Sequence, residues 1–343
     1  RAAAPRRRVE AGIFSAPGRK ARCPGWANQD ACLALPLGAG RVLAAVFDGH
    51  GEHGGTIAIA VRDLVEQLAP CLFGEGVEPG GDPLPVVLRR LFAVAHEGVA
   101  QGGLAQLSGT TATLAIIDAV AGSLSCAHIG DSRLVASDGG EVCFQISDHN
   151  IAGAEEARIA AAGGEVREVS VACSATRRVF APGKNYPGLA MSRALGDVQA
   201  HGLGVVADPD VAADVRLPPG GVVVVASDGV WQQVPPAEAA AQVAVAAEAR
   251  ASTGSAADGA EAVARELVTE ARARWDRAGG DADDASAVVV LLPHTFGDVA
   301  AASAASDAGK IGLPGEVAHV VAKSDAAAAS RPSGDEAGGE RLR

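Results

Sequence analysis

The sequence predicts an α+β fold, in which strands and helices are segregated rather than alternating. Short runs of β-branched residues recur along the chain, and segments with helical periodicity are grouped in one early pair and one late pair. A doubly wound parallel sheet would instead show regular alternation of strand and helix. Aromatic residues make up only 3% of the sequence, so aliphatic residues and alanine must build the core.

The expected strands are apolar runs, most of them bounded by Gly or Asp turn signals. They are Arg41–Phe47, Thr111–Ile117, Leu124–Ile129, Leu134–Ser137, Val142–Ile146, Val222–Ala226 and Ser286–Leu292. Between two of them, Ser137-Asp138-Gly139-Gly140 is typical of a hairpin turn. A further short apolar run, Cys32–Leu35, lies near the start of the chain.

Four segments have the spacing of an amphipathic helix, with apolar residues recurring every three or four positions. They are Thr56–Leu68, Leu84–Ala100, Pro236–Arg250 and Asp258–Trp275. Pro236 suits the first turn of a helix, and Asp258 with Glu261 has the spacing of a capping box.

The composition excludes several classes of protein. With 48% hydrophobic and 20% charged residues, the 343-residue chain is not wholly disordered. Its formal charge of −12 argues against a general nucleic-acid or anionic-membrane binder, because both need a basic surface. No apolar run reaches the roughly 18 residues that a membrane span needs. We expect a monomeric protein with neither a nucleic acid nor a membrane as partner.

Six cysteines (Cys23, Cys32, Cys71, Cys126, Cys143 and Cys173) are scattered without a C-x-x-C pair. Their even number allows three disulfides, but a chain of this length without a small-scaffold pattern favours free thiols, and the spacing disfavours zinc. We therefore expect an intracellular protein of the cytoplasm or nucleus. The basic segment 1–20 keeps organelle targeting open, since it fits either the remnant of a transit peptide or a basic arm.

Three regions follow from the distribution of residue types. Residues 1–8 form a basic N-terminal arm, and residues 9–293 hold the periodic segments of a globular domain. Residues 294–343 are rich in Ala, Ser and Gly, which predicts a weakly structured tail.

Acidic residues stand at the ends of four apolar runs. Asp48 and Asp228 follow two of the runs, and Asp30 and Asp283 precede two others. If these ends meet at one edge of a sheet, the carboxylates repel one another unless cations neutralise them. Oxygen ligands without cysteine select hard ions such as Mg²⁺ or Mn²⁺, and two such ions suit hydrolysis of phosphoryl groups.

His50 lies two residues after Asp48 in the segment Phe47-Asp48-Gly49-His50-Gly51. Asp-Gly is a common turn pair, so a turn alone would explain the first part of this segment. A turn does not require His50, whose imidazole would stand beside a carboxylate as an acid or base near neutral pH.

Nine motifs, taken in chain order over residues 10–293, resemble those of the protein phosphatase 2C family of metal-dependent serine/threonine phosphatases. They are Asn28-Gln29-Asp30; Phe47-Asp48-Gly49-His50-Gly51; Ser108-Gly109-Thr110-Thr111-Ala112; Gly130-Asp131-Ser132-Arg133; Ser147-Asp148-His149; Arg158-Ile159 leading to Ala162-Gly163-Gly164; Pro187-Gly188-Leu189-Ala190-Met191-Ser192-Arg193-Ala194-Leu195-Gly196-Asp197; Ala226-Ser227-Asp228-Gly229-Val230-Trp231; and Asp283-Asp284-Ala285-Ser286. The resemblance implies a central β-sandwich of two antiparallel sheets flanked by helices on both sides, and makes residues 9–293 a metal-dependent protein phosphatase domain.

The same resemblance implies a metal centre of two Mg²⁺ or Mn²⁺ ions. Asp48 would bridge the two ions, and the Gly49 carbonyl would be a further ligand. Asp228 and Asp283 would hold one ion of the pair. Asp131, together with Asp228, would bind a weaker third ion.

The resemblance also implies how the reaction runs. Asp30 and the adjacent Gln29 would orient waters on the metals, and the nucleophile would be a water or hydroxide bridging the two ions. His50 would be the general acid that protonates the departing serine or threonine oxygen.

The chain departs from the family's pattern at three places. An Arg that commonly grips the phosphate is replaced within Cys23–Ala27, and we expect the nearby Arg22 to bind phosphate instead. Gln232 stands where the family usually has Asp after Trp231. Asp284 stands where Asn is common, as either a spare ligand or a surface acid.

The leading hypothesis is therefore an enzyme that dephosphorylates phosphoserine and phosphothreonine in proteins, with phosphorylated proteins as its partners. The alternative is a catalytically weak homologue that acts as a phosphoprotein-binding regulatory scaffold. A two-metal nuclease or phosphodiesterase conflicts with the charge of −12.

Overall fold

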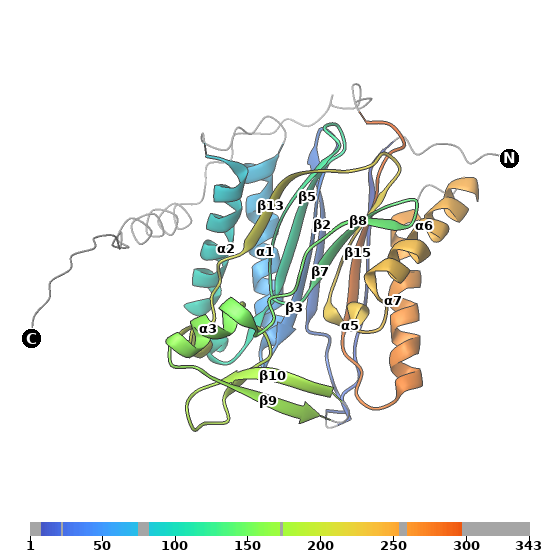
Figure 1. Ribbon diagram of the computed structural model, residues 1–343. Helices are drawn as coiled ribbons and strands as arrows, with labels where there is room; N and C mark the ends of the chain where they lie inside the picture. Colours follow the sequence, from blue (N-terminus) through green and yellow to red (C-terminus); the bar gives the residue numbers. More distant parts are fainter. Residues whose placement is uncertain (1–7, 22, 75–81, 172–173, 254–258, 297–343) are drawn as a thin grey trace, which may run out of the picture. The chain divides into compact units, whose positions relative to one another are not determined.

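Strands from the two ends of the described chain pair with each other. Strand β1 (Glu10–Ala16) runs antiparallel to β15 (Ala285–Leu291), which in turn runs antiparallel to β14 (Val222–Ala226). The computed structural model describes residues 8–21, 23–74, 82–171, 174–253 and 259–296 (Figure 1). All of these residues belong to one compact unit.

Two large antiparallel sheets are built around these strands. The first has the order β1-β15-β14-β7-β8, with β7 at Arg133–Asp138 and β8 at Glu141–Gln145. The second has the order β12-β4-β3-β5-β6-β13, and β2 pairs with β3 beside this path. Its strands are β2 (Asp30–Gly38), β3 (Arg41–His50), β4 (Gly109–Thr110), β5 (Ala112–Asp118), β6 (Ser123–Ile129), β12 (Leu195–Gly196) and β13 (Asp210–Arg216).

The two sheets pack face to face over an aliphatic core. Val46 and Ile117 of the second sheet share one buried cluster with Leu134, Val225 and Val288 of the first. The central strands are buried on both faces, because one face meets the other sheet and the opposite face meets helices. This two-sided burial explains why their sequences are continuous apolar runs rather than alternating ones.

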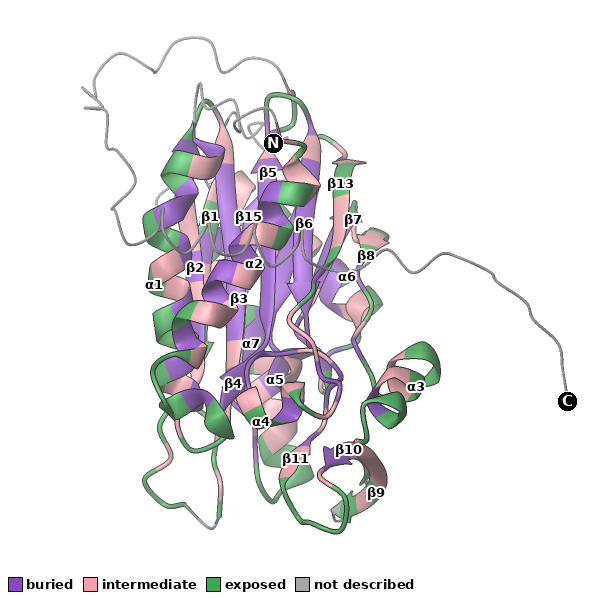
Figure 2. Cartoon of the chain, turned by 90° about the vertical axis from the view of Figure 1, so that its left-hand side faces the viewer, coloured by how far each residue is buried: buried purple, intermediate pink, exposed green. Residues whose placement is uncertain are grey.

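Helices cover the outer faces of both sheets, as Figures 1 and 2 show. Helices α1 (Gly54–Phe73) and α2 (Leu84–Ala100) contact the second sheet. Helices α6 (Pro236–Thr253) and α7 (Gly259–Ala278) contact the first, where α7 packs on β1 and β15. The expected β-sandwich flanked by helices on both sides is thus confirmed.

Shorter elements gather beside one end of the sandwich. They are η1 (Leu104–Gln106), α3 (Gly153–Ala161), α4 (Val198–His201), α5 (Asp228–Trp231) and a three-stranded sheet of β9 (Glu165–Val171), β10 (Ser174–Phe180) and β11 (Pro187–Leu189). In Figure 1 strands β9 and β10, with α3 next to them, lie below the two large sheets.

The apolar pattern located the central elements better than the outer ones. Every predicted strand overlaps an observed strand, and α2 has the predicted bounds. Strands β1, β9, β10 and β13 and the short strands β4, β11 and β12 were not predicted, and only the middle of β2 was. Charged residues interrupt the apolar pattern of β9, β10 and β13, as in the segment EVREVSV of β9.

The two predicted terminal regions fall mostly outside the described residues, so the proposed domain boundaries stay a prediction. Among the helices that the structure describes, none combines the length and the apolar character needed to cross a membrane. The five described cysteines are free thiols, and Cys173 lies outside the described residues.

Candidate active site

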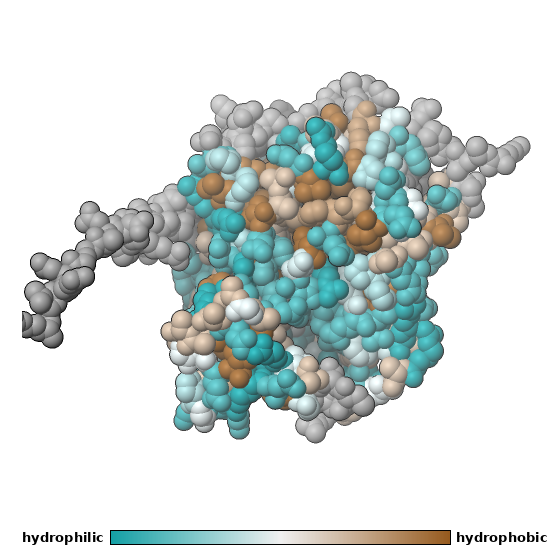
Figure 3. All heavy atoms as spheres, viewed as in Figure 1, coloured by the Kyte–Doolittle hydropathy of each residue, from teal (hydrophilic) through white to brown (hydrophobic). Residues whose placement is uncertain are grey.

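A cavity of about 600 Å³ opens where the strand ends of the sandwich meet the three-stranded sheet. Six of the residues predicted for the site line it: Asp48, Gly49, His50, Asp131, Asp228 and Asp283. Asp30 lies on the strand next to Asp48, and Arg22 lies outside the described residues. Hydrophilic residues (teal) predominate in the lower half of the face in Figure 3, with a mixed patch of brown and tan at the lower left.

Antiparallel pairing brings these acidic side chains together. Asp48 lies near the C-terminal end of β3 and is paired in register with Asp30 at the start of β2. Asp228 follows the end of β14, whereas Asp283 comes just before the start of β15. Asp131 lies in the turn from β6 to β7. In an antiparallel sheet, the start of one strand lies beside the end of its neighbour, which places Asp30 beside Asp48 in one sheet and Asp283 near Asp228 in the other. The packing of the two sheets then brings both pairs to the same end of the sandwich.

The protein environment disfavours the charged form of these carboxyl groups. Desolvation, with neighbouring carboxylates adding to it, raises the pKa of Asp48 and Asp228 well above the usual value for Asp. The same causes raise the pKa of Asp131 to about 6 and the pKa of Asp30 to about 7. Asp48, Asp131 and Asp228 are partly exposed and line the cavity, so a cation that enters it can reach them.

Asp30 carries an oxygen that lacks a protein partner. Its Oδ2 accepts a hydrogen bond from Ser227 Oγ at 2.8 Å, whereas its buried Oδ1 has no hydrogen-bond partner among the described residues. Unpartnered buried oxygens are costly, and a divalent cation or its waters would satisfy them. The donor set, all oxygen, fits Mg²⁺ or Mn²⁺.

The spacing of the carboxylates limits how one ion can be held. Among the described residues, only His128, His149 and Asp210 bring three ligand atoms within 4.8 Å of one another. The cavity carboxylates are spread more widely, so three of them would have to draw together to ligate one ion directly. Water, which Mg²⁺ gives up reluctantly, would fill the remaining positions.

Lys20 enters the cavity from the segment before β2. Its ammonium lies 2.7 Å from Asp283 Oδ1 and 5.3 Å from the centre of the Trp26 ring. Burial lowers the pKa of Lys20, but the charge and hydrogen bond of Asp283 outweigh that effect and raise it overall. Lys20 therefore stays charged beside the carboxylates.

Asp284 is not a surface acid, although it borders the cavity. It is only 5% exposed, and its oxygens accept hydrogen bonds from the backbone N–H groups of Gly18 (2.5 Å) and Gln29 (2.9 Å). The Trp26 indole donates to the same carboxylate at 3.0 and 3.1 Å. Through these hydrogen bonds Asp284 holds the segment between β1 and β2 against the start of β15.

His50 forms a close pair with Asp197, to which the sequence analysis assigned no role. His50 Nε2 lies 2.6 Å from Asp197 Oδ2, and the Asp197 side chain is only 2% exposed. Burial lowers the pKa of His50, but the charge and hydrogen bond of Asp197 outweigh it, so the pKa is raised overall. The signal for Asp197 was present, since it ends the motif Ala194-Leu195-Gly196-Asp197.

A small backbone ribbon places Asp197 next to His50. Strand β4 pairs with both β3 and β12, and the Asp197 N–H donates to the Ser108 carbonyl at 2.9 Å. Gly109 is needed at this point, because a Cβ there would lie 2.1 Å from Asp197 Oδ2. The glycine lets the carboxylate approach β4 closely.

The basic residues near the cavity differ in what they contact. Arg178 of β10 lines it and donates to the Gly188 carbonyl at 2.7 Å. Arg19 instead bonds Asp276 at 2.9 Å outside the cavity. Gln232 donates through Nε2 to Asp228 Oδ2, so an amide occupies the place where the family usually has a carboxylate.

Comparisons with known proteins agree on one family. A family model described as "Protein phosphatase 2C" matches residues 90–277, and a second with the same description matches residues 17–161. The chain is 32% identical over 235 residues to "Probable protein phosphatase 2C 64" of Oryza sativa subsp. japonica, covering 64% of this chain and 52% of that protein. It is 37% identical over 224 residues to "Probable protein phosphatase 1N" of Homo sapiens, covering 62% and 47%.

A longer match is to "Probable protein phosphatase 2C 48" of Oryza sativa subsp. japonica, 31% identical over 307 residues, with 77% of this chain and 80% of that protein covered. By contrast, the chain spans about half the length of the two relatives above. Among solved structures, serine-threonine phosphatase 2C from Toxoplasma gondii shares the fold with a TM-score of 0.65 and 21% identity, covering 84% of this chain and 97% of the other.

Proposed function

The chain belongs to the protein phosphatase 2C family, and from this premise we propose that it hydrolyses phosphoserine and phosphothreonine in proteins with two Mg²⁺ or Mn²⁺ ions. One observation carries the proposal within this chain. Carboxylates from separate strand ends converge on a single cavity, where the His50–Asp197 pair also lies. The substrates are phosphorylated proteins, as the family implies.

The acidic side chains of the cavity would hold the metal ions. The proposed direct ligands are the carboxylates of Asp48, Asp228 and Asp283 and the Gly49 carbonyl. Asp131 would help to bind a third ion more weakly. Divalent ions bound there would supply Lewis-acid charge and an activated water for attack on phosphorus. Asp30, fixed by Ser227, would accept hydrogen bonds from waters beside the ions.

His50 would act as the general acid. A carboxylate only accepts, so the Nε2–H of His50 donates to Asp197 and fixes the ring. Its Nδ1 has no hydrogen-bond partner among the described residues but is buried, so the ring would have to shift for this nitrogen to deliver a proton to the departing serine or threonine oxygen. By raising the pKa of His50, Asp197 keeps the imidazole protonated for this task.

Cationic side chains would hold the phosphate dianion. Lys20 and Arg178 both line the cavity, and Arg178 comes from the three-stranded sheet beside it. When metal ions neutralise Asp283, the Lys20 ammonium would turn from that carboxylate to a phosphate oxygen. The predicted contact of Arg22 stays a prediction, because Arg22 lies outside the described residues.

The test is hydrolysis of a phosphothreonine peptide with and without Mn²⁺. We expect release of phosphate that requires Mn²⁺ and that falls at least 100-fold in Asp228→Asn. A matched control is Asp276→Asn, which removes an acid outside the cavity and should keep full activity. A wild-type chain that binds Mn²⁺ and the peptide without hydrolysing it would refute the proposal and favour the scaffold role.

A further inference from the structure

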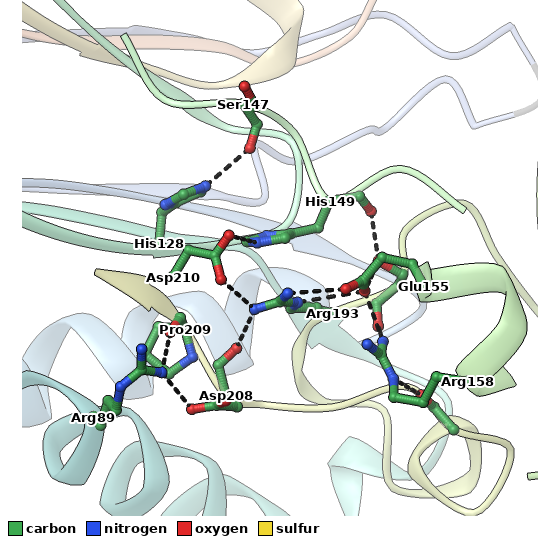
Figure 4. Close-up of polar contacts among 12 residues, drawn as sticks. Arg89, His128, Ser147, His149, Glu155, Arg158, Arg193, Asp208, Pro209 and Asp210 are labelled. Atoms are coloured by element: carbon green, nitrogen blue, oxygen red, sulfur yellow. Dashed lines mark hydrogen bonds and ion pairs between the residues drawn. The ribbon is translucent and has the colours of Figure 1, made fainter. Parts of the chain in front are cut away.

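A second polar cluster lies between β6, β13 and the loop after β8, and none of its side chains lines the acidic cavity. His128 on β6 is paired in register with Asp210 on β13, and His149 stacks on His128 with ring centres 4.6 Å apart. One ligand atom from each of the three side chains lies within 4.8 Å of the others. Figure 4 shows the two rings and the carboxylate facing a common space.

His149 is buried without a hydrogen bond to either ring nitrogen. The residue is only 5% exposed, and neither Nδ1 nor Nε2 has a hydrogen-bond partner among the described residues. Its nearest charged neighbour is Asp210, whose Oδ2 lies 3.3 Å from Nε2. A buried imidazole with only this long contact at Nε2 and none at Nδ1 is poorly satisfied, which leaves a further ligand favourable here.

His128 has the protonation state of a metal ligand. Its Nε2 lies 2.9 Å from the Ser147 carbonyl, which can only accept, so Nε2 carries the proton and Nδ1 holds the lone pair. Metal-binding histidines commonly donate their second nitrogen to a backbone carbonyl in this way. Burial lowers the pKa of His128, and burial with the neighbouring imidazole lowers that of His149 to about 4, so both rings are neutral near pH 7.

Asp210 supplies one oxygen to the cluster and uses the other to hold its position. Oδ1 accepts a hydrogen bond from Arg193 Nη1 at 2.8 Å, which leaves Oδ2 facing His149. Arg193 in turn donates to Glu155 Oε1 at 2.9 Å, so its charge is balanced on the side away from Asp210 (Figure 4). The surrounding ion pairs thus orient the carboxylate without occupying its second oxygen.

We propose that His128, His149 and Asp210 bind a transition-metal ion such as Zn²⁺, separate from the acidic cavity. Two imidazoles and one carboxylate suit Zn²⁺, whereas Mg²⁺ and Mn²⁺ prefer oxygen ligands. Bonds of about 2.0–2.2 Å require the three ligand atoms to draw together. Asp210, whose side chain is 60% exposed, has room to make that movement. The spacing of the cysteines gave no sign of this site because no cysteine belongs to it.

The experiment measures Zn²⁺ binding by competition with a chromophoric chelator, in saturating Mg²⁺ and with exposed thiols alkylated. Under these conditions Mg²⁺ competes with Zn²⁺ for the acidic cavity, and the exposed cysteines are removed as ligands. We expect one Zn²⁺ per chain and a loss of at least tenfold in affinity for both His149→Gln and Asp210→Asn. Co²⁺ in place of Zn²⁺ should give the visible absorption of a low-coordinate nitrogen and oxygen site, and this absorption should vanish in the same variants.

A second stacked histidine pair supplies the control. His96 and His201 lie with ring centres 4.2 Å apart but belong to no such cluster among the described residues, so His201→Gln should leave Zn²⁺ affinity unchanged. His149→Gln changes a buried residue and could prevent folding. In that case Asp210→Asn, at an exposed position, tests the proposal alone. Unchanged Zn²⁺ affinity in folded Asp210→Asn, or binding lost equally in His201→Gln, would overturn the proposal.

Discussion

Asp228 and Asp284 both border the cavity, yet their carboxylates differ in the hydrogen bonds that they accept. Asp284 accepts hydrogen bonds from N–H groups of Gly18, Trp26 and Gln29, so both of its oxygens have protein partners. Asp228 accepts a hydrogen bond from the side-chain amide of Gln232, and the carboxylates of Asp131 and Asp283 lie near it. Sequence position alone could not separate them, because each lies in an acidic motif at a strand end.

Removal of the Asp284 carboxylate should therefore destabilise the protein. Asp284→Ala leaves three buried or partly buried N–H groups without their acceptor, and we expect a loss of roughly 2–4 kcal/mol in the free energy of unfolding. Asp276→Ala, which breaks an exposed ion pair with Arg19, should cost about 1 kcal/mol or less. Urea unfolding measures both, and equal losses would contradict the role given to Asp284.

His50 should show a dependence on the leaving group. His50→Ala should lose about 10²–10⁴-fold in kcat on a phosphothreonine peptide, the usual range for one general acid. The loss should be smaller on an aryl phosphate, whose phenolate leaves without a proton. Asp197→Asn should lower the pKa of His50, so the alkaline fall in kcat should move to lower pH. A pH profile unchanged in Asp197→Asn would argue against this pair as the acid.

The ribbon of β3, β4 and β12 is the element that completes the site. Its strands β4 and β12 span two residues each, too short to show a periodic pattern, so sequence analysis could not predict that Asp197 meets His50. The long central strands were predictable because they are buried on both faces. The outer strands β9 and β13 carry charges that the apolar pattern does not accommodate.

Gly109→Ala tests the ribbon directly. The added Cβ would lie 2.1 Å from Asp197 Oδ2, so the carboxylate must move away from His50. We expect a loss of activity and a shift of the pH profile in the same direction as in Asp197→Asn. Gly98→Ala in α2, where a Cβ meets nothing within 4 Å, should keep activity and gain about 0.5–1 kcal/mol of stability. Equal activity in both variants would contradict this account of β4.

For the whole protein, the protonation of the buried carboxylates affects both the free energy of unfolding and the binding of metal ions. The folded-state pKa values of about 7 for Asp30 and about 6 for Asp131 exceed the usual value for unfolded Asp, about 3.9. Without metal, these two groups therefore favour the folded state at low pH, and that contribution is lost as pH rises through 6 and 7. A cation must displace the same protons, so its binding should weaken as pH falls.

Stabilisation by Mg²⁺ should consequently shrink on acidification. With Mg²⁺ at a hundredfold excess over its Kd at pH 8, we expect a gain of about 2.7 kcal/mol, or about 5–10 °C in Tm. The gain in Tm should be much smaller at about pH 5.5, measured by thermal unfolding with and without Mg²⁺ at each pH. A gain that is constant or that grows at low pH would show that these carboxylates do not bind the ion.

The most direct test of the central claim counts Mn²⁺ ions and hydrolysis in the same samples. Wild-type chain and Asp48→Asn are titrated with Mn²⁺ by calorimetry, and each is then assayed on a phosphothreonine peptide. The account predicts two ions per wild-type chain, fewer and weaker ions in Asp48→Asn, and hydrolysis that rises with occupancy of the cavity. Hydrolysis by the chelator-treated wild type, or full activity and unchanged Mn²⁺ binding in Asp48→Asn, would contradict it.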